Sequence, residues 1–91
     1  MFINEELAKD ENLTNNQKIL LARIMAEISI NGYCDITTRE LADELSSGKE
    51  IIRKNLKKLE QNNYIKIDKI KEPGKIKRLI RITDNYKKWI L

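Results

Sequence analysis

Lysine and arginine recur at helical spacing in one short stretch of the chain. Five of the ten residues from 49 to 58 are basic, and Ile52 and Leu56 mark an opposite, apolar side. Ammonium and guanidinium groups bind phosphates, and the planar fork of Arg53 can bond both acceptors on the edge of guanine. This stretch therefore predicts contact with a polyanion.

The charge of the 91-residue chain is unevenly divided. Residues 1–48 contain 4 basic and 9 acidic residues, a net charge of −5, whereas residues 49–91 contain 14 basic and 5 acidic residues, a net charge of +9. A face this positive attracts polyanions and speeds their association. The alternative is a lysine-rich surface that is merely solvated.

Several classes of chemistry are excluded by composition. The chain has no histidine and a single cysteine, Cys34, so it has no histidine-based triad, internal disulfide or cysteine-cluster metal site. Its three glycines lie far apart and form no phosphate-binding loop. We expect a protein with no catalytic residue, metal or cofactor. No apolar run approaches 18 residues and no leader is recognisable, so we expect a cytoplasmic protein without a membrane partner.

Capping signals divide the first half into helices. Thr14 and Gln17 have capping-box spacing before a helically spaced apolar run that ends at Asn31-Gly32. Thr37 and Glu40 repeat that spacing at the start of a two-turn helix, and the intervening segment, Tyr33–Thr37, is interpreted as a brief strand. We interpret residues 1–12 as an arm or a helical turn capped by Asn4.

A break at Ser46-Ser47-Gly48 precedes the basic stretch. Either Ser47, paired with Glu50, or Gly48 can cap a helix that ends at Asn62-Asn63. The apolar period then changes to two over Tyr64–Asp68 and again over Ile76–Ile82, with Pro73-Gly74 as the turn. These signals predict a β-hairpin with a basic tip at about residues 69–78.

Four segments match a known family in order and spacing. Leu13–Leu21 has a leucine and a small polar cap before a lysine and an apolar run, and Leu41-Ala42 is followed by Leu45. Ile52–Lys54 and Tyr64-Ile65 follow at the expected places. The chain resembles the winged helix-turn-helix domains of plasmid and phage replication initiators and related small regulators. The family usually has glycine at Ser46 and Asn63, and serine at Gly48.

The resemblance implies an α+β fold, with a three-helix core, a short first strand and a β-hairpin wing. Residues 13–83 would form the domain, residues 1–12 an arm and residues 84–91 an apolar tail. The implied function is non-enzymatic binding of double-stranded DNA by a recognition helix at about residues 48–62 and by the wing, in transcriptional regulation or replication initiation of a mobile element. The predicted DNA-binding residues are Thr38, Arg39, Ser47, Lys49, Glu50, Arg53, Lys54, Lys57, Lys75, Lys77 and Arg78.

Three alternatives stay open from the sequence. The basic face could bind or inhibit an acidic protein instead of DNA. Glu50 could accept a hydrogen bond from cytosine or simply complete a helix cap. A homodimer could form through the apolar residues of the arm and tail, or those residues could pack within one chain. The dimer residues are Phe2, Ile3, Leu7, Tyr86, Trp89 and Ile90.

Overall fold

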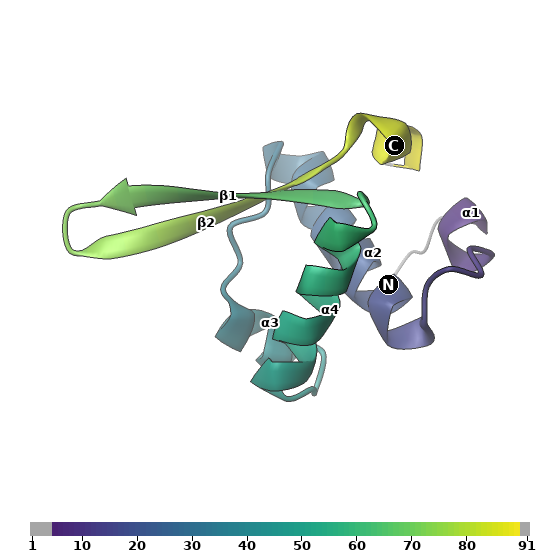
Figure 1. The fold of residues 1–91 in the computed structure, drawn as a ribbon, viewed down its shortest axis with the longest axis horizontal. Helices are drawn as coiled ribbons and strands as arrows, with labels where there is room; N and C mark the ends of the chain where they lie inside the picture. The colour runs from purple at the N-terminus through teal and green to yellow at the C-terminus, as the bar shows by residue number, and fades with distance from the viewer. Residues whose placement is uncertain (1–4, 90–91) are drawn as a thin grey trace.

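The computed structural model describes residues 5–89. In this part of the chain four α-helices are followed by an antiparallel hairpin and a 3-10 helix, which confirms the predicted α+β class (Figure 1). The elements are α1 (Glu5–Ala8), α2 (Asn15–Asn31), α3 (Thr38–Glu44), α4 (Lys49–Gln61), β1 (Ile65–Glu72), β2 (Lys75–Ile82) and η1 (Asp84–Trp89). Asn4, the expected cap of the first turn, lies outside the described residues.

Helix α2 begins and ends where its capping residues predict. The backbone N–H of Gln17 donates to the Thr14 hydroxyl at 3.2 Å, and the Gln17 side chain accepts from the Thr14 N–H at 3.1 Å. These two bonds satisfy amide groups that the first turn leaves without a helical partner. Gly32 closes the helix at φ 82°, a conformation that costs glycine little.

Helices α3 and α4 are joined by a tight turn from Leu45 to Gly48. Thr37 caps α3 by accepting from the Glu40 N–H at 3.1 Å. Gly48, rather than Ser47, occupies the N-cap of α4 and supplies no side-chain bond, so the Ser47–Glu50 capping box is wrong. The Ser47 N–H instead donates to Ala42 O at 2.9 Å, which holds Ser47 in the turn.

The hairpin formed by β1 and β2 projects to one side of the helices (Figure 1). Ile65 pairs with Ile82 at its base, and the register runs without a break to Glu72 opposite Lys75. Gly74 turns the chain at φ 83°. Because side chains alternate along a strand, one face of the hairpin looks toward the helices and the other away from them. The inner face carries Ile65, Ile67, Lys69, Lys71, Ile76, Arg78, Ile80 and Ile82.

The expected first strand does not form. Cys34 makes a single antiparallel bridge with Ile80, with N–O distances of 2.9 and 2.8 Å, and the other residues of segment 33–37 belong to no strand. The next hydrogen-bonded pair of such a ladder would join Ile36 to Arg78. There the Ile36 carbonyl accepts from the Arg78 guanidinium at 2.7 Å, so a side chain replaces the backbone partner.

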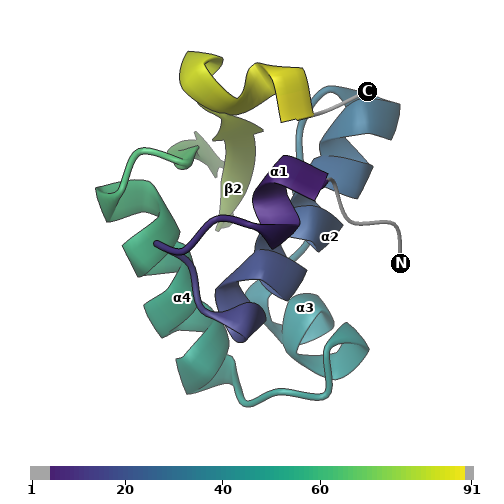
Figure 2. The ribbon, with the colours of Figure 1, turned by 90° about the vertical axis from the view of Figure 1, so that its right-hand side faces the viewer.

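The core lies between α2, α3, α4 and the base of the hairpin (Figure 2). Leu20, Leu21 and Ile24 of α2 are fully buried, as are Leu59 of α4 and Ile80 of β2. Burial of each such side chain contributes about 1.5–3 kcal/mol to the free energy of unfolding. Arg23 of α2 adds a polar tie to α3 by donating to Glu44 Oε2 at 2.7 Å, and this bond raises the arginine's pKa. These contacts hold α3 and α4 in place against α2.

The beginning and end of the described chain both pack on Tyr64. The Tyr64 hydroxyl donates to Asp10 at 2.7 Å, Leu7 is fully buried, and the ring of Tyr64 stacks on Tyr86 with a centroid separation of 4.5 Å. Tyr86 in turn contacts Trp89, whose indole N–H donates to Glu6 at 2.6 Å. Three of the residues assigned to a dimer surface are therefore engaged within one chain. Phe2, Ile3 and Ile90, the other three, lie outside the described residues.

Candidate nucleic-acid interface

Helix α4 buries most of its apolar side chains on one side and exposes its basic side chains on the other. Ile52, Asn55, Leu56 and Leu59 are buried against the rest of the molecule. The exposed side forms a basic ridge that consists of Lys49, Arg53, Lys54, Lys57 and Lys58. Since each ridge residue is exposed in the described structure, the ridge can contact a large partner without any rearrangement of the core.

One acidic residue, Glu50, lies within the basic ridge and pairs with Arg53. The Arg53 guanidinium donates to the Glu50 carboxylate one turn away. Both side chains remain open to solvent, with 57% of Arg53 and 87% of Glu50 exposed. The pair therefore lies on the surface of the helix, where both groups could contact a ligand.

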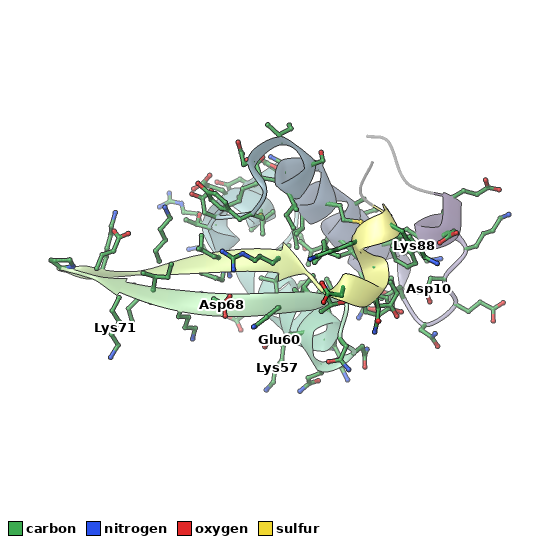
Figure 3. The ribbon with its side chains drawn as sticks, turned by 90° about the horizontal axis from the view of Figure 1, so that it is seen from above. Asp10, Lys57, Glu60, Asp68, Lys71 and Lys88 are labelled. Atoms are coloured by element: carbon green, nitrogen blue, oxygen red, sulfur yellow. The ribbon has the colours of Figure 1, made fainter. Side chains whose placement is uncertain are left out.

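A groove separates α4 from the base of the hairpin and is rich in cations. It is lined by Arg53, Leu56, Lys57, Glu60, Ile67, Lys69 and Arg78. Figure 3 shows that Lys57 and Glu60 of α4 and Lys71 near the hairpin tip project toward the same side of the molecule. The basic ridge and the inner face of the hairpin thus border this one positively charged groove.

Arg78, a predicted DNA contact, binds another predicted contact inside the protein. Its guanidinium donates to the Thr38 hydroxyl at 2.8 Å and to the Ile36 carbonyl at 2.7 Å. Both partners are neutral, and partial burial lowers the pKa of the arginine. Arg78 also lines the groove beside α4. Through its bonds to Thr38 and Ile36, Arg78 holds the hairpin against the start of α3.

The other predicted hairpin cations lie on the outer face. Lys75 is 3.7 Å from Glu72, and Lys77 is 3.6 Å from Asp35. The predicted basic hairpin therefore divides between two faces, with Arg78 on the inner face and Lys75 and Lys77 on the outer one.

Two predicted residues lie on or beside α3. Arg39 is exposed on that helix, whereas Ser47 is half-buried in the turn and lines a small hollow between α2 and α4. The structure thus brings together Arg53, Lys57 and Arg78 in one groove, and it places Arg39 and Ser47 outside that groove.

Lys69 lines the groove although it was not among the predicted site residues. The signal was present in the sequence, because Lys69 follows the inward-facing Ile67 by two residues and must share its face. The same alternation places Lys71 on the inner face, closer to the hairpin tip.

The described residues also bear on metal binding, on the cysteine and on membrane spans. Between residues 5 and 89, no three histidine, cysteine or acidic side chains are grouped so that they could hold a metal ion. Cys34 is fully buried, and burial raises the pKa of its thiol. Within the same range, every helix is too short or too polar to cross a bilayer.

Comparisons of the chain with family models, with curated proteins and with solved structures found no match in any of the three.

Proposed function

We propose that this protein binds double-stranded DNA as a winged helix-turn-helix module. In this proposal α3 and α4 form the helix-turn-helix pair, α4 is the recognition helix and the hairpin is the wing. One observation carries the proposal: α4 buries its apolar side against its own domain and leaves the basic ridge exposed along its length.

The dimensions and chemistry of the ridge suit the DNA major groove. That groove is about 12 Å wide and admits one α-helix. In this proposal Arg53 bonds guanine, and Lys49, Lys54 and Lys57 bind phosphates, which fix position without reading sequence. Lys69 and Lys71, on the inner face of the hairpin, extend the phosphate contacts along the duplex.

Two backbone positions support the resemblance to winged-helix domains. Ser46 and Asn63 have φ values of 51° and 63°, and they are the two non-glycine residues with positive φ in the described chain. Both are positions at which the family usually has glycine. A positive φ at the turn and at the exit of α4 is therefore the conformation that the family's glycines favour.

The biological role follows from the same resemblance. We assign the module to transcriptional regulation or to replication initiation of a phage or plasmid, because winged-helix domains of similar pattern serve those processes. In either role the protein binds a specific duplex and performs no covalent chemistry.

Salt dependence of duplex binding tests the proposal directly. If about six phosphates are neutralised, the logarithm of the association constant falls by about five per decade of salt. Lys57→Gln should reduce that slope by about 0.9, because one phosphate contact is lost. Lys9→Gln removes the same charge from a residue that follows α1, pairs with Glu5 and lies outside the basic ridge and the groove, and it should leave the slope unchanged. Fluorescence anisotropy with a labelled duplex measures both slopes.

The same measurements also distinguish DNA binding from the alternative, in which the basic ridge binds an acidic protein. Absence of duplex binding at 50 mM salt would overturn the proposal. Weak duplex binding that Arg53→Ala leaves unchanged, together with a stable complex between the ridge and one acidic protein, would favour the protein-interaction module instead.

A further inference from the structure

Glu50 is the acidic residue at the end of α4 where the basic ridge begins. Its side chain is 87% exposed, and Lys49, Arg53 and Lys54 surround it on the helix. A carboxylate in this position opposes the binding of phosphates, since like charges repel. Phosphate binding by the basic ridge therefore does not account for this carboxylate.

Helix capping does not account for the presence of Glu50 either. Gly48 is the N-cap of α4 and makes no side-chain bond, and the residue three positions later is Ile51 rather than Glu50. Glu50 does lie in the first turn, where a negative charge stabilises a helix. That effect depends on charge alone, whereas Glu50 also bonds a specific partner, Arg53.

Within the major groove, a carboxylate has few partners. Base edges there present two kinds of donor, the N4 amine of cytosine and the N6 amine of adenine. Arginine requires acceptors and matches N7 and O6 of guanine. In adenine the N6 donor lies beside the N7 acceptor, which repels a carboxylate, so Glu50 and Arg53 are complementary in chemistry to a cytosine and a guanine.

The spacing of the two residues suits neighbouring base pairs. Residues three apart in an α-helix are separated by about 4.5 Å along the axis, and successive bases are about 3.4 Å apart. A carboxylate has about four acceptor positions, so Glu50 can keep its bond to Arg53 while it accepts from a base. The ion pair then holds the Arg53 fork in a fixed direction before DNA arrives.

We propose that Glu50 and Arg53 act as one base-reading unit, in which Arg53 bonds guanine and Glu50 accepts from the N4 amine of cytosine in the neighbouring base pair. This inference rests on the proposed function, and it specifies the target as a duplex with guanine beside cytosine under the start of α4. Lys49, Lys54 and Lys57 hold the phosphates on either side.

Selection of bound duplexes from a random pool tests the pair, with three proteins in parallel. The wild-type chain should enrich a site that contains guanine next to cytosine. Glu50→Gln should change the preferred base at one position from cytosine to adenine by about tenfold, because glutamine bonds adenine through N6 and N7. Glu11→Gln removes the same charge from the exposed segment between α1 and α2, outside the groove and the basic ridge, and should select the wild-type site.

Affinities of the selected duplexes complete the test. If Glu50→Gln tightens binding to every duplex equally and leaves the preferred bases unchanged, Glu50 only repels phosphates and the inference is wrong while the proposed function stands. A wild-type protein that retains no duplex from the pool removes the proposed function, and the inference with it. Thermal unfolding followed by circular dichroism establishes that each variant is folded.

Discussion

The side chain of Arg78 on β2 bonds the hydroxyl of Thr38, the first residue of α3, at 2.8 Å. A second bond from the same guanidinium reaches the carbonyl of Ile36 at 2.7 Å. The pair joins the hairpin to the loop that enters α3, at the point where the ladder between Cys34 and Ile80 has ended. A polar clamp thus sets the angle between the hairpin and the helices.

Arg78→Lys should weaken this clamp. Lysine presents a point charge instead of a planar fork, so it cannot keep both bonds in the same geometry. We expect the free energy of unfolding to fall by about 1–2 kcal/mol, as measured by urea titration. Arg81→Lys is the matched control, because Arg81 lies on the outer face of the same strand and makes only an exposed contact of 3.8 Å with Asp68. It should cost less than about 0.5 kcal/mol. Equal losses in the two variants would show that the clamp contributes nothing.

Ser46→Gly should stabilise the protein. Ser46 has φ 51°, and a side chain in the left-handed region costs about 1–2 kcal/mol, which glycine avoids. The greater flexibility of glycine in the unfolded chain offsets about 0.5–1 kcal/mol of this gain. The net gain should be about 0.5–1 kcal/mol in urea unfolding. Ser47→Gly, where φ is not positive, should instead destabilise the protein. A loss of stability in both variants would contradict the backbone argument.

Alkaline pH should destabilise the protein through Tyr64. Burial, and then the hydrogen bond of 2.7 Å to Asp10, raise the pKa of the Tyr64 phenol. A raised pKa in the folded state means that this group's contribution to stability is fully present below about pH 10 and is lost as the pH rises further. Between pH 7 and pH 10.5 the wild-type chain should lose about 0.8 kcal/mol more than Tyr64→Phe.

Urea midpoints of the two proteins at both pH values measure this difference. At pH 7, Tyr64→Phe should itself be less stable by about 1–2 kcal/mol, because it leaves Asp10 without the phenol. Identical pH dependence in the two proteins would mean that Tyr64 ionises as freely in the folded chain as in the unfolded one.

The thiol of Cys34 should resist modification in the native protein. Its side chain is fully buried, and burial raises its pKa, so the reactive thiolate is both shielded and disfavoured. At pH 8 we expect an anionic disulfide reagent to react more than about 100-fold faster in 8 M urea than in buffer, since reaction requires opening of the core. A native rate close to the rate in urea would place Cys34 at the surface.

Local signals predicted most of the fold. The Thr14–Gln17 capping box, the glycine at the end of α2 and the alternation around Pro73-Gly74 each act over a few residues, and each appears in the structure. The start of α4 was ambiguous because Ser47 and Gly48 both suit an N-cap. The choice depends on how the turn packs, and Ser47 is held there by its bond to Ala42.

The site was harder to predict because it depends on which face of the hairpin meets the helices. The sequence shows that a strand carries a lysine or an arginine. It does not show whether that side chain will bond another segment of the protein or face the solvent. The sequence therefore predicts that Arg78 belongs with Lys75 and Lys77, whereas in the structure it shares a face with Ile80 and bonds Ile36. For the same reason the predicted site does not include Lys69. Faces on α4 were easier to assign, because four buried positions define its apolar side.

The hydrogen bond from Trp89 to Glu6 joins residues that are 83 positions apart in sequence. A short peptide that joins the chain just before Glu6 to the chain just after Trp89 would therefore close the backbone into a ring with little distortion, and new termini could be opened at Pro73-Gly74. Such a circular permutant keeps α4 and its support intact while separating the two strands of the hairpin. It would allow the hairpin's share of ligand affinity to be measured without replacing a single side chain.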